Sequence, residues 1–371
     1  MNVEESVLER YSRGAESAQP SLCCAVDYDS ELLRLLPAEV IEKDYGCGDP
    51  SRFIRSGDVV LDLGSGSGKI CYIAAQLVGE QGAVIGVDMN DDMLSLARRY
   101  QAEMARRIGS DRVSFRKGYI QDLKLDLEAV DGYLAEHPIT NSSDLANFKA
   151  WKAEQKSHSP LIPDNSVDLV VSNCVLNLVA ESDKRRMVDE IFRVTKPGGR
   201  VAIADIVSDE PVPEHLKTDP ELWSGCISGA MQEEGFLNAF VHAGFQGVCI
   251  AKWDDSPWRT IDGIEFRSMT VTAFKGRGTE CLDRGHAVIY RGPFSKIHDD
   301  DGHYYPRGQR IAVCERTYHL LLERYRDEFI GIETLIQMEP KTWCAPAGTR
   351  RAVSETKGSV LHQNVPGGSC C

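Results

Sequence analysis

The sequence lacks the long apolar segments and the cationic clusters that mark two large classes of protein. None of its hydrophobic runs approaches the ~18 residues that a membrane-spanning helix requires. Its 42 Lys and Arg residues are outnumbered by 56 Asp and Glu residues, which gives a formal net charge of −14. Nucleic acids and anionic membranes both favour clustered positive charge. We therefore expect neither a nucleic acid nor a membrane as a partner.

Cysteine is too scarce for a small disulfide-stapled scaffold, although there are twelve cysteines in all. They make up about 3% of the chain, below the ~8–10% typical of disulfide scaffolds. None has the C-x-x-C spacing of zinc sites and thioredoxin-like motifs, but two pairs are adjacent, Cys23-Cys24 and Cys370-Cys371. Residues 1–10 are polar and acidic, unlike a secretory signal peptide. These features predict a cytoplasmic protein with mostly reduced thiols.

An alternation of short apolar runs and helical segments dominates the middle of the chain. Runs rich in Val and Ile occupy 58–63, 83–88, 112–116, 167–172 and 200–206, with later strands expected at 247–253 and 268–274. Helical periodicity is found at 69–78, 93–108 and 183–194, and the last helix ends at the sequence KPGG, residues 196–199. This alternation is typical of buried parallel strands in βαβ units. It predicts an α/β fold.

The sequence outside this alternation predicts an N-terminal arm, an inserted helical segment, a C-terminal domain and a tail. Residues 1–50 read as an N-terminal arm with one short helix near 30–41, and 121–163 as an inserted helical segment. A small α+β C-terminal domain is expected over 283–353, with strands at 288–290 and 311–313 and a helix at 317–329. Residues 354–371 are rich in Gly, Ser and polar residues and predict a mobile tail.

A glycine-rich segment, Asp62-Leu63-Gly64-Ser65-Gly66-Ser67-Gly68, joins the first predicted strand to the first helix. Glycines there permit a tight turn and let a ligand approach the helix N-terminus closely. The spacing G-x-G-x-G departs from the G-x-G-x-x-G fingerprint of dinucleotide sites. Asp88, about 20 residues further on, ends the second strand and can bind ribose hydroxyls. A nucleoside without a pyrophosphate fits this loop and Asp88, and S-adenosylmethionine is the leading candidate. The alternative interpretation is a glycine turn that binds no ligand.

The loop, the spaced acid and the KPGG turn resemble the class I S-adenosylmethionine-dependent methyltransferases, over about residues 57–274. The resemblance implies a Rossmann-like sheet of seven strands with the last antiparallel, and a cofactor-binding domain over 51–210. It places Asp88 at the ribose, Met89 beside the adenine and Asn173 near the methionine moiety. The implied cofactor contacts are Asp62, Gly64, Ser65, Gly66, Gly68, Asp88, Met89, Tyr119, Ile120, Gln121 and Asn173.

No general base stands out at the predicted strand ends, but cysteines do. Cys174 follows the fourth strand and Cys226 the fifth, so both are expected at the carboxyl edge where ligands bind in such sheets. Cys47 lies between glycines in the arm, and Cys71 opens the first helix, where the dipole can lower a thiol pKa. For each, the alternative is a small buried hydrophobic side chain. We favour that interpretation for Cys249, Cys281, Cys314 and Cys344.

Several thiolates beside a methyl donor imply a thiophilic substrate. Trivalent arsenic fits, because it binds three sulfurs and keeps a lone pair that attacks the sulfonium methyl without a general base. Attack formally oxidises arsenic to the pentavalent state. Further cysteines can return two electrons by forming a disulfide, which an external thiol then reduces.

The sequence strongly resembles the arsenite methyltransferases from Cys47 to at least Leu322. The matching blocks are YGCG at 45–48, LDLGSGSGKICY at 61–72, SNCVLNL at 172–178, SGCISGA at 224–230 and GHAVIYRGPF at 285–294. The resemblance implies that Cys174 and Cys226 hold the arsenical, with Cys47 as third ligand for arsenite. It also implies that Cys71 joins a disulfide cycle with Cys47 or Cys174. It further implies that residues 211–282 form an arsenic-binding region and that thioredoxin or glutathione is the reductant. We expect the protein to be a monomer.

Two rival functions stay open at this stage. One is a methyltransferase for a carbon or oxygen acceptor such as a quinone or sterol ring, and the other is a thiol-based metalloid sensor. His298, Asp299–Asp301 and His303 offer possible metal ligands, but without the alternating acids of a calcium loop they favour a solvated turn. Cys370-Cys371 is equally consistent with arsenite capture and with a bare tail.

Overall fold

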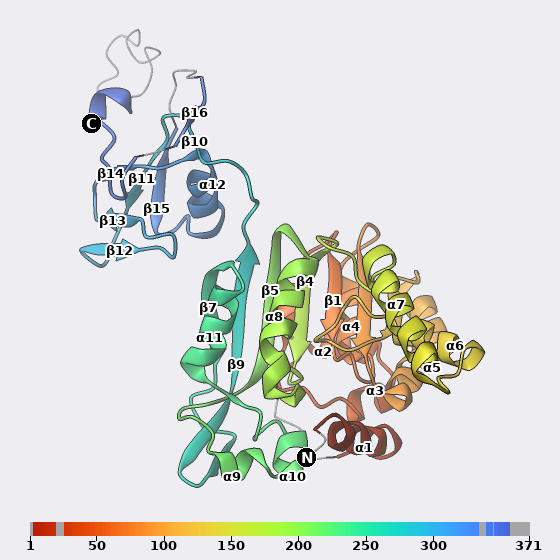
Figure 1. Cartoon of the computed structure of the whole chain (residues 1–371). Coiled ribbons are helices and arrows are strands. Elements are labelled where there is room, and N and C mark those ends of the chain that lie inside the picture. The colour runs from red at the N-terminus through yellow and green to blue at the C-terminus, as the bar shows by residue number, and fades with distance from the viewer. Residues whose placement is uncertain (1–2, 20–25, 334–338, 344, 357–371) are drawn as a thin grey trace. The chain divides into compact units, whose positions relative to one another are not determined.

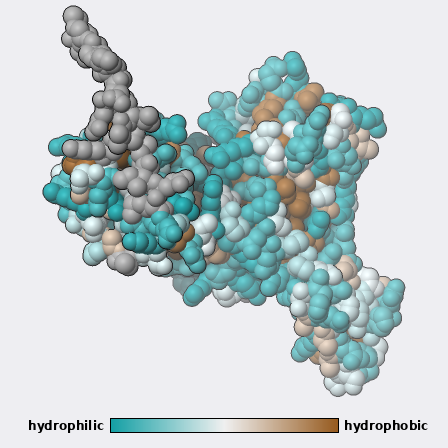
Figure 2. Space-filling model, turned by 90° about the horizontal axis from the view of Figure 1, so that it is seen from above, coloured by the Kyte–Doolittle hydropathy of each residue, from teal (hydrophilic) through white to brown (hydrophobic). Residues whose placement is uncertain are grey.

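A computed structural model describes residues 3–19, 26–333, 339–343 and 345–356. The chain divides into two compact units at Gly276, slightly before the boundary expected at residue 282. The predicted mobile tail, residues 354–371, lies mainly outside the described residues. The cysteines at 23, 24, 344, 370 and 371 lie wholly outside them. Hydrophilic residues cover most of the surface visible in Figure 2, in keeping with the high charge of the sequence.

The larger unit is built on a nine-stranded mixed sheet whose main path has the order β3-β2-β1-β4-β5-β9-β7 (Figure 1). Strands β1 to β5 are parallel, whereas β9 is antiparallel to both β5 and β7. Two short strands, β6 and β8, pair with β5 and β9. The seven-stranded sheet with its last strand antiparallel is thus confirmed. The strands are β1 (Val59–Leu63), β2 (Ala83–Asp88), β3 (Val113–Lys117), β4 (Val167–Asn173), β5 (Thr195–Ser208), β6 (Met231–Gln232), β7 (Phe245–Trp253), β8 (Arg259–Ile261) and β9 (Ile264–Lys275).

Helices cover both faces of this sheet, which explains why its strands are apolar at successive positions. Leu61 and Leu63 of β1 pack into a core with α8 (Lys184–Val194) and α11 (Glu233–His242). Val60, the residue before Leu61, points into the opposite core with α4 (Lys69–Leu77) and α5 (Asp91–Ile108). The helices expected at 69–78, 93–108 and 183–194 are therefore present.

The N-terminal arm differs from the expectation in two respects. The single helix expected near 30–41 is two short ones, α2 (Ser30–Arg34) and α3 (Ala38–Glu42), separated at Pro37. Proline lacks an amide proton and disfavours a helical residue before it, so the helix breaks there. A further helix, α1 (Val3–Glu16), was not predicted, and a short 3-10 helix, η2 (Pro50–Phe53), leads into β1.

The insertion expected over 121–163 is helical, as predicted. It forms α6 (Leu127–Glu136) and α7 (Ser142–His158), held together by stacking of Tyr133 on Trp151 with ring centroids 4.3 Å apart. Short helices follow the fourth and fifth strands at the carboxyl edge of the sheet. They are η3 (Leu176–Leu178), η4 (Glu181–Asp183), α9 (Glu214–Lys217) and α10 (Pro220–Ser224).

The smaller unit combines a three-stranded sheet, two short two-stranded ladders and one helix, as the α+β prediction required. The helix expected at 317–329 ends at Arg324, because Phe329 begins a strand that pairs with β11. The elements are β10 (Leu282–Asp283), β11 (Ala287–Tyr290), β12 (Lys296–His298), β13 (Tyr304–Pro306), β14 (Arg310–Ala312), α12 (Glu315–Arg324), β15 (Phe329–Ile332), β16 (Lys341–Thr342) and η5 (Val353–Glu355). Across the described residues, no helix has the length and apolar character needed to cross a membrane.

Candidate active site

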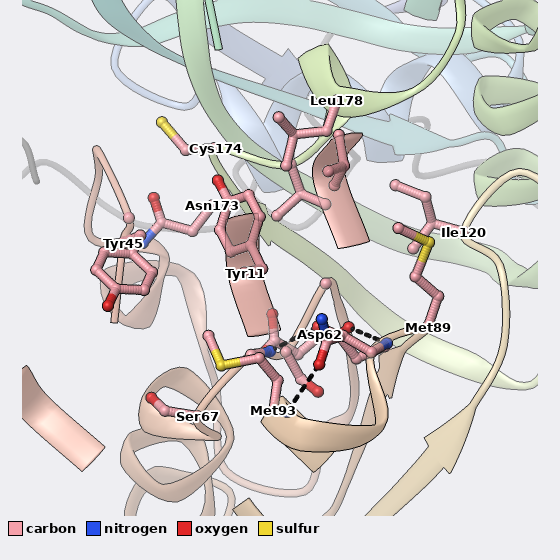
Figure 3. A pocket seen from close by; sticks show the side chains of 18 of the residues that line it. Tyr11, Tyr45, Asp62, Ser67, Met89, Met93, Ile120, Asn173, Cys174 and Leu178 are labelled. Atoms are coloured by element: carbon pink, nitrogen blue, oxygen red, sulfur yellow. Dashed lines mark hydrogen bonds between the residues drawn. The ribbon is translucent and has the colours of Figure 1, made fainter. Parts of the chain in front are cut away.

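A pocket of about 960 Å³, its open mouth included, lies where β1, β2 and β4 end (Figure 3). Most of the predicted cofactor contacts line it: Asp62, Gly64, Ser65, Gly66, Asp88, Met89, Ile120, Gln121 and Asn173. Cys174 lines the same pocket, at the edge where Asn173 lies (Figure 3). Gly68 and Tyr119, which were also predicted, are not part of its lining.

The glycine loop needs glycine because its backbone is left-handed at three places. Gly64, Gly66 and Gly68 have φ angles of 71°, 49° and 84°, which side chains rarely permit. Asp88 supports the loop, since one of its carboxylate oxygens accepts the Gly66 N–H at 2.9 Å. A Cβ on Gly68 would come within 2.8 Å of the Phe115 ring. Gly68 therefore serves the packing of α4 rather than the pocket wall.

The hydroxyl of Ser65 is a polar group of the loop whose hydrogen-bonding capacity is left unsatisfied. It is buried and has no hydrogen-bond partner among the residues that the structure describes. An unsatisfied buried hydroxyl is costly, so a ligand with a matching polar group would stabilise it. The lining residues Asp62, Ser65 and Asp88 offer acceptors and one hydroxyl, which suits the amino and hydroxyl groups of S-adenosylmethionine.

Cys71, in the first turn of α4, is fully buried next to Asp62 and is not one of the residues that line the pocket. Its thiol donates a hydrogen bond to Asp62 Oδ2 at 3.2 Å. Burial, reinforced by the Asp62 charge, raises the pKa of the Cys71 thiol well above its usual value. The expectation that the helix dipole lowers this pKa was therefore wrong, because desolvation outweighs the dipole at a side chain with no exposed surface.

Burial also raises the pKa of Asp62, to about 7. The unfolded chain releases this proton near pH 3.9, so between about pH 4 and 7 the folded state holds a proton that the unfolded state has lost. We therefore expect the free energy of unfolding to fall as the pH rises through this range. In Asp62→Asn, chemical denaturation at pH 5 and pH 8 should show a smaller fall. Glu80→Gln, an exposed acid, is the control, and an unchanged fall in Asp62→Asn would contradict the assignment.

A disulfide joins Cys47 of the arm to Cys174 at the end of β4. Their Cα atoms are 5.7 Å apart, although the two residues are 127 positions apart in the sequence. Cys71 and Cys226, by contrast, are not part of a disulfide. The structure thus brings two of the three predicted arsenic ligands together as a bonded pair.

The side chain of Asn173 fixes the loop that carries Cys47. Its Oδ1 accepts the N–H groups of Cys47 and Gly48 at 2.8 Å each, and its Nδ2 donates to the Gly48 carbonyl. The sequence placed Asn173 near the methionine moiety. In the structure Asn173 lines the pocket, but its amide is engaged with the arm. Its main geometric effect is to hold Cys47 over Cys174.

Position 46 requires glycine because the arm passes so close to Asn173. A Cβ on Gly46 would lie 2.0 Å from Asn173 Nδ2, closer than any packing allows. We expect Gly46→Ala to lower the free energy of unfolding by about 1–3 kcal/mol, as overpacking does, measured by chemical denaturation. Gly235→Ala is the matched control, because a Cβ there meets nothing and replacing a helical glycine should stabilise by roughly 0.5–1 kcal/mol. Equal stability of both variants would refute this account.

Cys226 lies beside Cys174 and beside an acid. The ligand atoms of Cys174, Cys226 and Asp205 all lie within 4.8 Å of one another, and the three residues are buried. The Cys226 thiol also donates to the Cys174 carbonyl at 3.3 Å. Both cysteines have a φ of 61°. A left-handed backbone is uncommon for residues other than glycine and concentrates at functional sites.

Sequence analysis missed Asp205, although it interrupts the apolar strand β5. Its carboxylate accepts the Ile206 N–H and the Asn177 amide, each at 2.8 Å, and the Asn177 backbone N–H at 3.2 Å. Burial raises the pKa of Asp205 to about 7, against the effect of these hydrogen bonds. A single acid in an otherwise apolar predicted strand was the signal that could have found it.

Helix α1 supplies the other side chains that sequence analysis missed. Its residues Glu4, Val7 and Tyr11 line the pocket, and the Tyr11 ring is labelled in Figure 3; the Cys226 thiol acts electrostatically on the Tyr11 hydroxyl. Burial, then the neighbouring thiol, raises the pKa of Tyr11 well above its usual value. Asn90 anchors α1 from below, donating to the Leu8 carbonyl at 3.2 Å. Helix α1 therefore covers the pocket.

The remaining described cysteines and the turn that contains His298 and His303 are not among the residues that line the pocket. Cys314 is buried as expected, whereas Cys249 is exposed and Cys281 half-buried, so the prediction of buried hydrophobic roles was wrong for Cys249. In the turn, Asp299 accepts hydrogen bonds from His303 and from the Tyr305 hydroxyl. Asp300 and Asp301 are exposed, in keeping with a solvated turn.

Comparison with known proteins adds independent information. A family described as a methyltransferase domain matches residues 54–145 and 134–244, and one described as a domain of unknown function matches residues 277–361. The arsenite methyltransferase of Aquipseudomonas alcaligenes is 32% identical over 86% of this chain and 87% of its own length. That of Mus musculus is 30% identical over 89% of this chain and 80% of its own. A solved arsenic(III) S-adenosylmethionine methyltransferase from Chlamydomonas reinhardtii aligns with a TM-score of 0.55 and 27% identity, over 89% of this chain and 100% of that one.

Proposed function

The chain belongs to the arsenite methyltransferase family, and from this premise we propose that it methylates trivalent arsenic held by Cys47, Cys174 and Cys226. The observation that carries the proposal is the shared position of the sulfurs and the pocket. Cys174 lines the pocket of the glycine loop, and the Cys226 sulfur lies within 4.8 Å of the Cys174 sulfur. A thiophilic atom bound there faces the methyl donor.

The chain's own residues bind and orient the cofactor. S-adenosylmethionine, when bound, supplies an electrophilic methyl group on a sulfonium centre. Ser65 and Asp88 suit its polar groups, and Met89 and Ile120 offer an apolar wall. Tyr11 and Val7 of α1 close the pocket against water, which protects the sulfonium centre and keeps the reacting atoms aligned.

Arsenic needs no general base in this mechanism, because its lone pair carries no proton. Cys174 and Cys226 would hold the arsenical so that this lone pair points into the pocket. Buried, nearly rigid sulfurs suit that task, since both residues are only 5% exposed. Positioning then provides most of the rate enhancement.

The disulfide cycle is the finer part of the proposal. Methyl transfer leaves arsenic formally pentavalent, and two protein thiolates return it to the trivalent state by giving up two electrons and forming one S–S bond. The Cys47–Cys174 disulfide is the oxidised state that such a step leaves behind. An external thiol reductant, either thioredoxin with its two thiols or two molecules of glutathione, restores the two protein thiols by exchange and is itself oxidised to a disulfide.

Cys71 has a less direct place in the cycle than the resemblance suggested. Its expected partners, Cys47 and Cys174, are bonded to each other here, and its thiol donates to Asp62. Its part in the cycle stays a prediction, as do the monomeric state and the cytoplasmic location.

Turnover tests the proposal directly. Pure protein is incubated with isotopically labelled S-adenosylmethionine, arsenite and a thiol reductant, and arsenic species are separated by chromatography with mass detection. We expect labelled methylarsenicals only when reductant is present. Arsenite that binds tightly without being methylated would indicate a metalloid sensor. Neither binding nor methylation would indicate another methyl acceptor.

A further inference from the structure

Two cysteines and an acid form a compact buried cluster at the carboxyl edge of the sheet. One ligand atom each from Cys174, Cys226 and Asp205 lies within 4.8 Å of the other two, and all three residues are buried. In a tetrahedral zinc site with Zn–S bonds of about 2.3 Å, neighbouring sulfurs lie roughly 3.8 Å apart. The spacing of the cluster is therefore compatible with ligands around a single metal ion.

Hydrogen bonds fix the orientation of the Asp205 carboxylate. It accepts the Asn177 side-chain amide and the Ile206 N–H at 2.8 Å each, and the Asn177 N–H at 3.2 Å. Carboxylates that ligate a metal are held by hydrogen bonds in this way. Lys184 acts electrostatically on Asp205, but its ammonium pairs with Glu181 at 2.8 Å. A cation bound beside Asp205 would therefore compensate a buried charge whose neighbouring ammonium is already engaged.

The backbone holds the two cysteines near each other independently of the disulfide. The Cys174 N–H donates to the Ala204 carbonyl at 2.8 Å, and the Cys226 N–H donates to the Trp223 carbonyl at 3.0 Å. The Cys226 thiol also donates to the Cys174 carbonyl at 3.3 Å. None of these hydrogen bonds involves Cys47. We therefore expect the cluster to persist when the Cys47–Cys174 disulfide is reduced, which leaves the Cys47 thiol beside it.

We propose that the reduced protein binds Zn²⁺ through Cys174, Cys226 and Asp205, with Cys47 as the fourth ligand. Sulfur and carboxylate donors in a four-coordinate arrangement suit this thiophilic divalent cation. Zn²⁺ displaces one proton from each of the three thiols to the solvent, and no electron moves. Cys174 lines the pocket, so the ion reaches the cluster from there. The inference rests on the proposed function in one respect, because the shared sulfurs make Zn²⁺ and arsenite competitors.

Asp205 should distinguish zinc from arsenic. Zinc accepts a carboxylate among its four ligands. Trivalent arsenic binds three sulfurs in a pyramid and keeps a lone pair in the remaining direction, so the proposed arsenic site makes no use of the carboxylate. Removal of the Asp205 charge should therefore weaken the binding of zinc and leave the binding of arsenic almost unchanged. A general affinity of the thiols for soft reagents predicts no such difference.

The experiment titrates the full-length reduced protein with Zn²⁺ in competition with a chromophoric chelator. We expect the wild-type protein to hold tightly bound zinc that phenylarsine oxide, a trivalent arsenical with two exchangeable positions, displaces. Asn177→Ala removes the amide that orients the carboxylate and should lower the zinc affinity by about 10–100-fold, and Asp205→Asn by at least as much. The affinity of Asp205→Asn for phenylarsine oxide should stay close to that of the wild-type protein. Glu80→Gln, at an exposed acid, is the control and should change neither affinity.

Cysteine variants identify the sulfurs. Cys226→Ser should lose the displaceable zinc, whereas Cys249→Ser, which removes an exposed thiol of β7, should keep it. Far-UV circular dichroism and binding of S-adenosylmethionine check that each variant folds. Because three different ligand or supporting residues are tested, a folding defect in one variant leaves the others informative.

Three results would overturn the inference. The first is the absence of displaceable zinc in the wild-type protein, and the second is an undiminished zinc affinity in Asp205→Asn. The third is an equal loss of zinc and phenylarsine oxide affinity in Asp205→Asn, which would make Asp205 a residue that positions the cysteines. Zinc binding without methylation would contradict the proposed function alone. Methylation without zinc binding would contradict this inference alone.

Discussion

Replacing Cys174 with serine should abolish methylation of every trivalent arsenical, and so should replacing Cys226. Both sulfurs hold the arsenical in the proposed mechanism, and a serine hydroxyl binds trivalent arsenic far more weakly than a thiolate. A misplacement of about 1 Å already costs about 10²-fold in rate, so we expect losses of at least that size. Initial rates with arsenite and with monomethylated trivalent arsenic, measured with dithiol present, test this directly.

The matched control for these variants is Cys249→Ser. Cys249 is an exposed free thiol on β7, so its loss removes a sulfur without touching the pocket. Cys174→Ser and Cys226→Ser should fold normally, because serine accepts the same backbone geometry about as readily as cysteine does. Far-UV circular dichroism and binding of S-adenosylmethionine confirm this separately from turnover. Unimpaired methylation by Cys174→Ser would remove the arsenic site from this edge of the sheet.

Replacing Cys47 should separate the two methylation steps. Arsenite has three exchangeable positions and can bind a third sulfur ligand, which Cys47 provides. Monomethylated trivalent arsenic has two exchangeable positions and needs only Cys174 and Cys226. We expect Cys47→Ser to lose arsenite methylation by about 10²-fold or more while retaining most activity on the monomethylated substrate. The ratio of the two initial rates, with excess dithiol present, is the measurement. An equal loss on both substrates would show that Cys47 acts in some other way.

Cys71→Ser gives the informative comparison with Cys47→Ser. If Cys71 belongs to the disulfide cycle, this variant should also spare methylation of the monomethylated substrate. Serine can still donate a hydrogen bond to Asp62, so the wall of the pocket keeps its contact. A variant with normal rates on both substrates would make Cys71 a structural residue and leave Cys47 and Cys174 as the redox pair.

The strands and the glycine loop could be predicted from the sequence because their signals are local. The apolar run at 83–88 matches β2, and the helices at 69–78 and 183–194 differ from α4 and α8 by one residue each. Glycines at 64, 66 and 68 predicted a tight turn, and their φ angles are all positive. The helix expected at 317–329 was wrong beyond Arg324, because the pairing of Phe329 with β11 overrides the local helical pattern.

The sequence by itself determined the sheet, the loop and which cysteines adjoin the strand ends, since each depends on residues close together in the chain. Only the tertiary structure decided which cysteines meet. Cys47 reaches Cys174 across 127 residues because Asn173 binds the arm. Asp205 and Tyr11 join Cys226 in the same manner. Contacts between distant segments leave no periodic pattern in a sequence, because they arise from the packing of whole elements rather than from neighbouring residues.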